Sequence, residues 1–272
     1  MTSFSIVDVA RIPSHLLDHR VAALGICRFE SLATAQSRQV KMLGRASADT
    51  RFHELAACDC IQNGARWRDC SAACHLATRL FRAELLLSEP ALLTSAGGEI
   101  TFFTLVPSRW RRQLSALKTL NPRRLATEVA RALRGTGKST LRATFDVEID
   151  FRKDADGDYW APHVHGIIVG ASQRRVRDAL LLLVCDDLNP RPLKLICTPP
   201  SEIPILLNYS TKWVDVQRTR YATPSGRLRW RKVPLRPSQQ LELDAWRRGF
   251  PVGFAHTRIG FKRNGRFLVC TS

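Results

Sequence analysis

The sequence has few acidic side chains for its number of basic ones. Its 272 residues include 24 Asp and Glu against 42 Lys and Arg, which gives a formal net charge of +18. Such an excess does not bear on the fold, but it favours polyanionic partners, nucleic acid first and anionic membrane surfaces second. Hydrophobic residues at 44% and charged residues at 24% are ordinary for a globular chain and argue against disorder.

Long apolar runs are also missing. The longest one, "ALLLLVC" at 179–185, is far shorter than the roughly 20 residues that a membrane-spanning helix needs. The first residues show no basic segment followed by an apolar stretch, which is the pattern of a secretory signal. We therefore expect a cytoplasmic protein without a membrane partner.

The eight cysteines are read in the light of that expected compartment. Without a secretory signal, a framework of disulfides is disfavoured. Four of the cysteines lie close together in the sequence, at Cys58, Cys60, Cys70 and Cys74. In a cytosolic protein such a cluster is either a structural zinc site or a group of reduced, unliganded thiols. Their spacing is not a standard zinc pattern, so both interpretations stay open.

Patterns of apolar residues, prolines and glycines predict an α+β fold with a central, mainly antiparallel sheet flanked by helices. We expect a helical N-terminal region with the cysteine cluster over 1–95, a central domain over 96–217 and a basic C-terminal extension over 218–272. The helices expected are 74–89, 109–120, 122–135, 172–188 and 201–217. The strands expected are 99–107, 139–152, 161–170 and 192–199, the middle two forming a hairpin.

Two histidines stand one residue apart in the second strand of that hairpin, in "PHVHGIIV". Side chains alternate along a strand, so His163 and His165 share one face with Cβ atoms about 7 Å apart. The preceding strand offers carboxylates on one face at Asp146, Glu148 and Asp150. Imidazole nitrogens suit Mn²⁺ or Zn²⁺, whereas Mg²⁺ requires additional oxygen ligands. The alternative is a hydrogen-bonded histidine pair near the end of a sheet.

A tyrosine and a lysine lie three residues apart in "LLNYSTKW". On the predicted helix, Tyr209 and Lys212 share a face. A phenol beside an ammonium group can attack a phosphodiester, because the positive charge offsets the charge that develops on the phosphate. The alternative is an amphipathic helix with a partly exposed tyrosine. The chain has only three tyrosines, and this is the one followed by a lysine at helical spacing.

Taken in order, four segments resemble the motifs of the HUH endonucleases, most of all the rolling-circle replication initiators of plasmids and phages. The segments are "FFTLV" (102–106), "DVEID" (146–150), "PHVHGIIV" (162–169) and "YSTK" (209–212). The resemblance covers about residues 100–215. The segment "YSTK" holds a single tyrosine, which is similar to the HUH endonucleases that use one tyrosine. It implies an HUH-nuclease, RRM-like sheet. It also implies Mn²⁺ or Mg²⁺ bound by His163, His165 and Glu148. Asp146 and Asp150 remain alternatives to Glu148 as the third ligand.

The resemblance also implies an activity. Tyr209, with Lys212 as its electrostatic partner, would nick and rejoin single-stranded DNA at a replication origin through a 5′-phosphotyrosine. Rolling-circle replication would then proceed with a host helicase and polymerase. A transposase or relaxase with the same chemistry is the nearest alternative. The alternative of another class is a non-enzymatic, zinc-containing nucleic-acid-binding protein.

The segment 218–236 is strongly basic and holds two aromatic residues, but no acidic ones. Phosphates and stacked bases account for that combination, which predicts a contact with DNA. The alternative is a solvated basic segment. The residues that we expect to contact DNA are Arg218, Arg220, Arg227, Arg229, Trp230, Arg231 and Lys232.

Overall fold

The computed structural model of the chain describes residues 3–26, 29–45, 67–136, 140–155, 157–184, 191–212, 215–265 and 267–271. Its helices are α1 Ser14–Ala22, α2 Leu32–Arg45, α4 His75–Ser95, α5 Pro122–Arg134, α6 Gln173–Leu181, α7 Ile203–Thr211 and α8 Pro237–Arg248. The strands of the main sheet are β2 Ile100–Leu105, β3 Arg112–Gln113, β4 Arg142–Asp154, β5 Gly157–Val169, β6 Leu193–Cys197, β7 Val216–Ala222, β8 Leu228–Pro234 and β9 His256–Ile259. A smaller sheet holds β1 Ser3–Ser5, β10 Phe261–Asn264 and β11 Phe267–Cys270.

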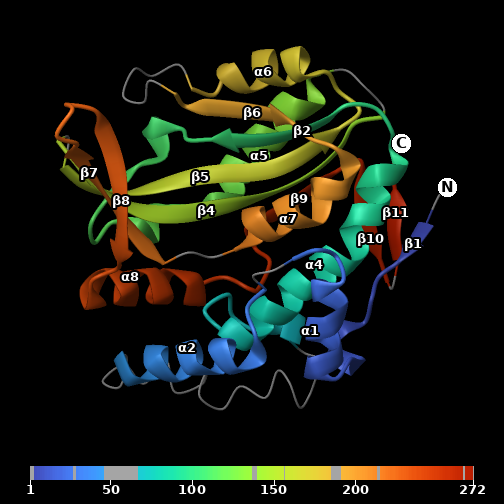
Figure 1. Cartoon of the computed structure of the whole chain (residues 1–272), viewed down its shortest axis with the longest axis horizontal. Coiled ribbons are helices and arrows are strands. Elements are labelled where there is room, and N and C mark those ends of the chain that lie inside the picture. The colour runs from blue at the N-terminus through green and yellow to red at the C-terminus, as the bar shows by residue number, and fades with distance from the viewer. Residues whose placement is uncertain are drawn as a thin grey trace.

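The main sheet is ordered β6-β2-β5-β4-β7-β8, with β3 added beside β5 and β9 beside β4. All of these pairs are antiparallel except β4 and β7, which run parallel. Helices and strands do not alternate regularly, so the α+β class with a mainly antiparallel sheet is confirmed. The sheet curls, and the β7–β8 hairpin stands at its far end from the chain termini (Figure 1).

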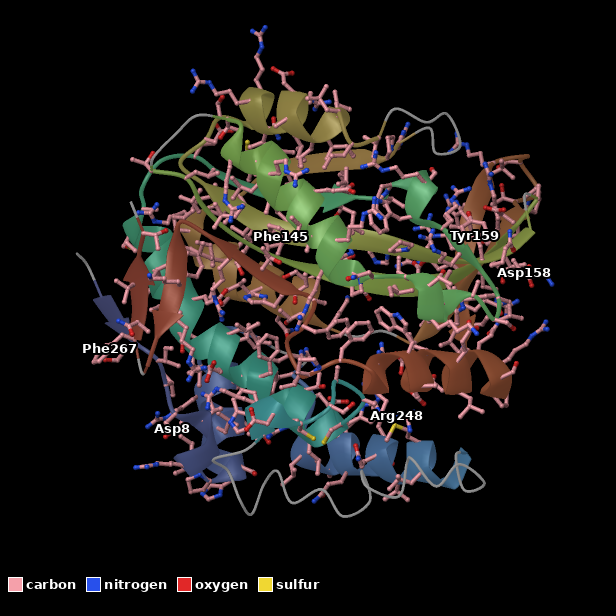
Figure 2. All side chains as sticks on the ribbon, turned by 180° about the vertical axis from the view of Figure 1, so that it is seen from behind. Asp8, Phe145, Asp158, Tyr159, Arg248 and Phe267 are labelled. Carbon is pink, nitrogen blue, oxygen red and sulfur yellow. The ribbon has the colours of Figure 1, made fainter. Side chains whose placement is uncertain are left out.

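The β4–β5 hairpin is the centre of the sheet, and it follows the alternation in the sequence. Each strand has 13 residues, and the register places Glu148 opposite His163 and Asp146 opposite His165. Phe145 and the other apolar residues of β4 point to the opposite face, where they join the larger hydrophobic cluster. Figure 2 shows Phe145 beneath α5 and Tyr159 near the turn of the hairpin.

Helices cover the two faces of the sheet differently. The helices α5 and α6 lie over one face, whereas α7 lies on the other face beside α4 (Figure 1). The sheet face beneath α5 is largely apolar and includes Phe103, Val164 and Ile168. On the α7 face the apolar residues, such as Phe102 and Ile167, give way to the polar residues of the hairpin. This polar stretch of an otherwise buried face is where functional residues gather.

Strand pairing crosses the boundaries expected at 95 and 217. The N-terminal strand β1 pairs with β11, so the two ends of the chain lie side by side (Figure 1). Beyond residue 217, β8 extends the main sheet and β9 pairs with the middle of β4. Residues after 217 therefore contribute to the main sheet.

The helix expected over 109–120 is wrong. Two short 3₁₀ turns, Ser108–Trp110 and Leu117–Thr119, stand there, separated by β3, which pairs with β5. Ser115 has a φ of 68°, which a right-handed helix cannot include. The Glu242 carboxylate of α8 accepts hydrogen bonds from the backbone N–H groups of Ser115 and Leu117. These tertiary hydrogen bonds therefore satisfy backbone N–H groups that would otherwise be bonded within a helix.

Three helix ends also differ from expectation. The helix α4 continues through Pro90 to Ser95, because Leu92 and Leu93 are fully buried beyond the proline and their burial offsets its cost of roughly 3 kcal/mol. The helix α6 ends at Leu181 rather than 188, and residues 185–190 lie outside the described part. The helix α7 ends at Thr211, after which the backbone becomes extended and β7 begins.

Candidate functional site

Three buried side chains of the β4–β5 hairpin converge on the α7 face. The Nε2 atoms of His163 and His165 lie 3.1 Å and 3.3 Å from the same Glu148 oxygen, Oε2. One potential ligand atom from each residue lies within 4.8 Å of the others. Two imidazole nitrogens and a carboxylate oxygen are a donor set for a divalent ion such as Mn²⁺ or Zn²⁺. The three residues predicted as metal ligands are therefore brought together.

The outer nitrogens of both imidazoles are held by hydrogen bonds. His163 Nδ1 donates to the backbone carbonyl of Ala161 at 3.2 Å. His165 Nδ1 lies 2.9 Å from the Thr104 hydroxyl of the neighbouring strand β2. In both rings the nitrogen that faces Glu148 is therefore Nε2, and a divalent ion would take the place of protons there. Thr104 was not predicted as a site residue, although it lies in the segment "FFTLV" that carries part of the resemblance.

The other two carboxylates of the acidic strand are engaged elsewhere. Asp146 Oδ2 lies 3.0 Å from Nδ1 of His256 on β9. Asp150 forms ion pairs with Arg152, at 3.0 Å, and with Arg218 of β7. Neither carboxylate belongs to the metal-ligand group found among the described residues. Of the three alternatives in the sequence, the geometry therefore favours Glu148.

Charge in the group is coupled. Burial alone would raise the pKa of Glu148, but His163 and His165 hold that pKa well below its usual range. Burial alone would lower the pKa of His163, but Asp150 and Glu148 raise it. The pKa of His165 is lowered, chiefly by burial. The carboxylate is thus ionised, and the two histidines differ in proton affinity.

Tyr209 reaches the histidines from α7. Its ring centroid lies 5.2 Å from that of His165 and 5.8 Å from that of Phe102, both in edge-on contacts. Tyr209 is 39% exposed and lines the cavity in front of the histidines. Burial, and then the charge of Glu148, raises the pKa of this phenol. The other two tyrosines lie elsewhere: Tyr159 is buried and donates to Asp154, and Tyr221 is on β7.

Lys212 stands one residue beyond the end of α7, not on the helix as expected. Its backbone is extended, yet its Nζ lies 3.9 Å from the centroid of the Tyr209 ring. A cation over the face of an aromatic ring is attracted by the negative face of that ring. Burial lowers the pKa of Lys212. The pair predicted from the sequence is therefore in contact, through a different backbone geometry.

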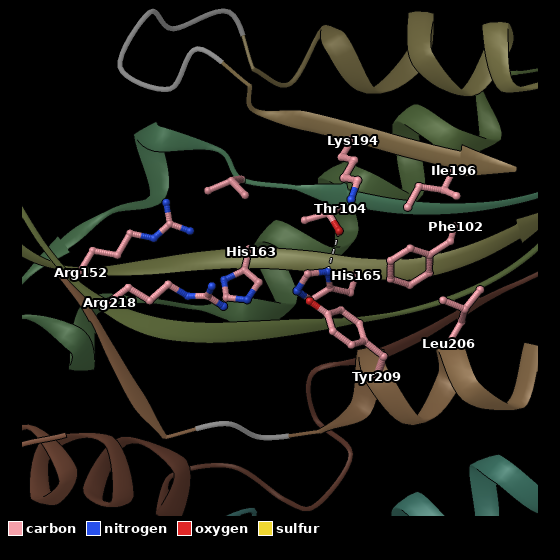
Figure 3. A pocket seen from close by; sticks show the side chains of 11 residues that line it. Phe102, Thr104, Arg152, His163, His165, Lys194, Ile196, Leu206, Tyr209 and Arg218 are labelled. Carbon is pink, nitrogen blue, oxygen red and sulfur yellow. Dashed lines mark hydrogen bonds between the residues drawn. The ribbon is translucent and has the colours of Figure 1, made fainter. Parts of the chain in front are cut away.

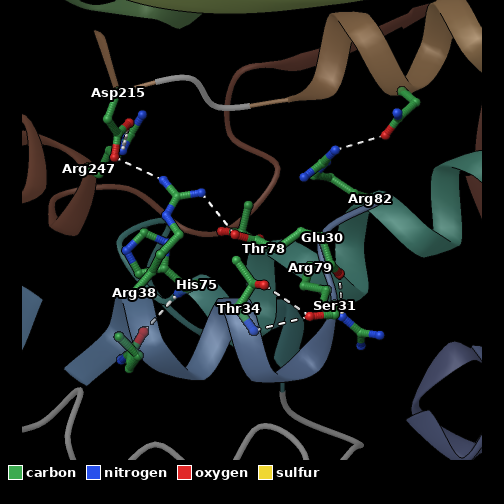
Figure 4. Close-up of polar contacts among 12 residues, drawn as sticks. Glu30, Ser31, Thr34, Arg38, His75, Thr78, Arg79, Arg82, Asp215 and Arg247 are labelled. Atoms are coloured by element: carbon green, nitrogen blue, oxygen red, sulfur yellow. Dashed lines mark hydrogen bonds and ion pairs between the residues drawn. The ribbon is translucent and has the colours of Figure 1, made fainter. Parts of the chain in front are cut away.

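Arginines of α2, α4 and α8 contact α7 and the residues that follow it. Arg82 of α4 donates a hydrogen bond of 2.8 Å to the side chain of Asn208, the residue before Tyr209. Burial lowers the pKa of Arg82 to about 10. Beyond α7, Arg38 of α2 and Arg247 of α8 both pair with Asp215. Figure 4 shows Arg38 and Arg82 extending from their helices toward these partners.

A cavity of about 430 Å³ opens in front of the histidines. Figure 3 shows two arginines at one end of it, His163 and His165 in the middle, and apolar side chains beside Tyr209 at the other end. Lys194 of β6 adds a further positive charge at its edge. The cavity thus offers cations next to the candidate metal group and apolar surface next to the candidate nucleophile. Its lining residues are Phe102, Thr104, Val106, Arg152, His163, His165, Lys194, Ile196, Leu206, Tyr209 and Arg218.

The cysteine cluster is described only in part. Cys74 occupies the N-cap of α4, where its sulfur accepts from the N–H of Ala77 at 3.5 Å. A hydrogen bond with Cys70 lowers the pKa of Cys74 to about 7. Cys58 and Cys60 lie outside the described residues. The zinc site stays a prediction.

The predicted DNA contacts belong to the β7–β8 hairpin. Only Arg218 reaches the cavity. The remaining six are exposed, Arg227 in the turn and the others along the strands. Trp230 lies beneath Arg152, whose guanidinium carbon is 5.4 Å from a ring centroid. Arg152 lines the cavity and also contacts Trp230, so it links the cavity to the β7–β8 hairpin. Arg152 was not among the residues predicted to contact DNA.

Together these features define an α+β protein with a buried His-His-Glu group that could hold a divalent ion, beside an accessible tyrosine. Comparison with protein-family models, with curated proteins and with solved structures finds no significant match. Among the described residues, no helix is both long and apolar enough to cross a bilayer.

Proposed function

We propose that the protein is a metal-dependent endonuclease and strand transferase that attacks single-stranded DNA with Tyr209. The observation that carries the proposal is the 5.2 Å separation of the Tyr209 and His165 rings at one cavity. These residues lie 44 positions apart, on a helix and a strand, so chain connectivity alone does not bring them together. Around them the protein supplies cations on several sides, which suits a phosphodiester substrate.

The proposed reaction exchanges one phosphorus–oxygen bond for another. The Tyr209 oxygen bonds to the scissile phosphorus and releases its phenolic proton, while the bond to the 3′ oxygen breaks and that oxygen takes up a proton. The products are a 5′-phosphotyrosine and a free 3′-hydroxyl. Because the covalent link keeps the energy of the broken ester, a 3′-hydroxyl can later reverse the step and rejoin the strand.

Burial raises the pKa of Tyr209, so positive charge near the phenol would favour its ionised form. Lys212, against the phenol ring, offsets charge that develops on the oxygen. Arg152 and Arg218 can bind the phosphate oxygens, since both line the cavity. The Phe102 ring packs edge-on against Tyr209 and limits the orientations of the phenol.

The donor set fits a metal ion. Both Nε2 atoms face one carboxylate oxygen, and each Nδ1 is held by another partner, so ligand orientation is fixed in advance. The residues that would hold Mn²⁺ or Mg²⁺ are Glu148, His163 and His165. When bound, such an ion supplies Lewis-acid polarisation of the scissile phosphate.

The test is covalent attachment. The purified chain is incubated with Mn²⁺ and a fluorescently labelled random-sequence pool of single-stranded DNA, then run on a denaturing gel. We expect a labelled protein band for the parent chain and none for Tyr209→Phe, whose binding of DNA stays close to that of the parent. Tyr221→Phe is the matched control and should label normally.

The outcomes separate the candidate functions. Labelling of the Tyr209→Phe variant would rule out this nucleophile. A parent chain that binds DNA but never becomes labelled, under Mn²⁺ or Mg²⁺, would favour the non-enzymatic nucleic-acid-binding protein. The resemblance of "DVEID", "PHVHGIIV" and "YSTK" to rolling-circle initiators favours replication initiation, with a host helicase and polymerase, over a transposase or relaxase.

A further inference from the structure

The β7–β8 hairpin has two faces with different surroundings. Side chains alternate along each strand, and the register pairs Arg218 with Lys232 and Arg220 with Trp230. These residues therefore share one face. Arg218 places that face on the side of the candidate active site, because its guanidinium pairs with Asp150 and lines the cavity.

The opposite face turns toward the protein core. Gln217 is buried and accepts a hydrogen bond of 3.2 Å from the side chain of Gln239 on α8. Its neighbour on β4 is Phe151, a fully buried core residue. In the register, Arg231 pairs with Thr219 and Arg229 with Tyr221, so both arginines share the face of Gln217. Basic residues that are contiguous in the sequence are thus divided between two directions.

On the first face, positive charge continues from the cavity without a break. Arg152 of β4 lies beside Arg218 in the parallel pairing, and Arg218 lies beside Lys232. Asp150 is 1% exposed and pairs with both arginines, so it balances one of the two charges and leaves a net positive pair. Arg152 also packs over Trp230, which is 40% exposed. A flat aromatic surface next to several cations suits a stacked base between phosphates.

We name this surface the strand track. It consists of Arg152, Arg218, Arg220, Trp230 and Lys232.

We propose that the strand track binds the single-stranded DNA adjoining the scissile phosphate, and that Arg229 and Arg231 lie outside its path. The proposal rests on the proposed function for the identity of the polymer. The positive charge of the strand track and its continuity with the cavity favour a single strand of DNA as the occupant. Trp230 stacks on a base, while Arg220 and Lys232 contact backbone phosphates. Duplex DNA would find less support, because its bases are already stacked on one another.

The test measures binding alone. All variants carry Tyr209→Phe, so that no covalent product forms, and binding of a labelled single-stranded dT₂₀ is followed by fluorescence anisotropy over a salt series. Arg220→Ala and Lys232→Ala should each weaken binding several-fold and reduce the slope of log K against log salt by about 0.7. Arg229→Ala and Arg231→Ala remove the same charge from the same hairpin and should leave the slope unchanged.

The aromatic contact has its own matched pair. Trp230→Ala should weaken binding about tenfold with little change in the salt slope, because stacking does not displace counterions. Tyr221→Ala, on the other face of the hairpin, should bind like the parent. All substituted residues are exposed, and equal thermal unfolding midpoints would confirm that the variants are folded.

Several results would overturn the proposal. Equal losses for Arg229→Ala and Arg220→Ala would show a diffuse field in place of a track. Tighter binding of duplex than of dT₂₀, or face-dependent binding of anionic vesicles without binding of dT₂₀, would assign the surface to another partner. If rU₂₀ showed the same dependence on the face of the hairpin and bound more tightly than dT₂₀, the surface would be assigned to RNA. None of these readouts involves cleavage, so failure of the Tyr209 nucleophile is detected separately, by the labelling gel.

Discussion

The strand β4 carries two buried histidine–carboxylate clusters, and they differ in how their imidazoles are used. In the first, His163 and His165 direct Nε2 at Glu148 while their outer nitrogens are held elsewhere. In the second, His256 lies 3.0 Å from Asp146 through Nδ1 and 3.0 Å from Glu89 through Nε2. Both of its nitrogens donate to carboxylates, so a single imidazole bridges two anions and no second imidazole joins it.

The two clusters also differ in their charge balance and in their access to the cavity. Arg258 pairs with Glu89 at 2.7 Å, so the cluster of His256 is internally balanced by two cations and two anions. Both histidines of the first cluster line a cavity. Burial does not distinguish the clusters, since all of these side chains are nearly inaccessible. The comparison teaches that the convergence of two imidazoles on one carboxylate oxygen and access to a cavity, rather than burial, mark the site fit for chemistry.

The largest expected effect breaks the first cluster. His165→Ala should abolish Mn²⁺ binding and lower DNA labelling by about a thousandfold or more, since polarisation of a phosphate by a metal contributes several kcal/mol. Calorimetric Mn²⁺ titration and the labelling gel are the measurements. His256→Gln is the matched control and should keep both properties. Labelling that survives in EDTA would count against the metal.

Breaking the second cluster should affect stability instead. His256→Ala leaves Asp146 and Glu89 buried with less positive charge and should lower the free energy of unfolding by about 3–5 kcal/mol. Urea denaturation followed by circular dichroism measures it. His15→Ala, an exposed histidine on α1, should stay within about 0.5 kcal/mol of the parent. Equal stability of the two variants would show that the ion pairs of His256 contribute little.

The second cluster should also make stability depend on pH. Burial alone would lower the pKa of His256, but Asp146 and Glu89 raise it from 6.5 to about 9. A raised pKa means that protonation favours the folded state, so this contribution is complete below pH 6.5 and is lost as the pH rises through 9. It amounts to about 3 kcal/mol. Between pH 6 and 10, the midpoint temperature of thermal unfolding should fall more steeply for the parent than for His256→Gln. Parallel curves would contradict the assignment of this pH dependence to His256.

The smallest effect concerns the support of the first cluster. Thr104→Val removes the hydrogen bond to His165 and should weaken Mn²⁺ binding by about 10–100-fold, because the imidazole loses its fixed orientation. Thr101→Val is the control on the same strand. Its hydroxyl is buried and has no hydrogen-bond partner among the described residues, so this change should leave Mn²⁺ affinity unaltered. Equal effects of the two variants would remove Thr104 from the site.

The sequence was informative where a local period decided the structure. Strict alternation in "TFDVEIDF" and the histidines of "PHVHG" predicted the β4–β5 hairpin, its polar face and the three residues that could hold an ion. Pro122 marked the start of α5, and the structure adds the side chain of Asn121, which accepts from two backbone N–H groups. These signals are local, so no partner element is needed to interpret them.

What failed depended on partners that are distant in the chain. The helix expected over 109–120 was replaced because Glu242, more than 120 residues away, accepts backbone hydrogen bonds there. Thr104 and Arg152 could be assigned to the site only once the pairing of β2 with β5 and of β4 with β7 was known. The resemblance had already named Glu148, but setting Asp146 aside required its contact with His256 from β9.

The most direct test of the account is to locate the covalent link. The chain is labelled with single-stranded DNA in Mn²⁺, digested with nuclease and protease, and its nucleotide-bearing peptide is identified by mass spectrometry. The account predicts a phosphodiester-linked nucleotide on Tyr209 alone, which disappears in EDTA and in His165→Ala. A nucleotide on Tyr159 or Tyr221, or one on Tyr209 that forms without a divalent ion, would contradict it.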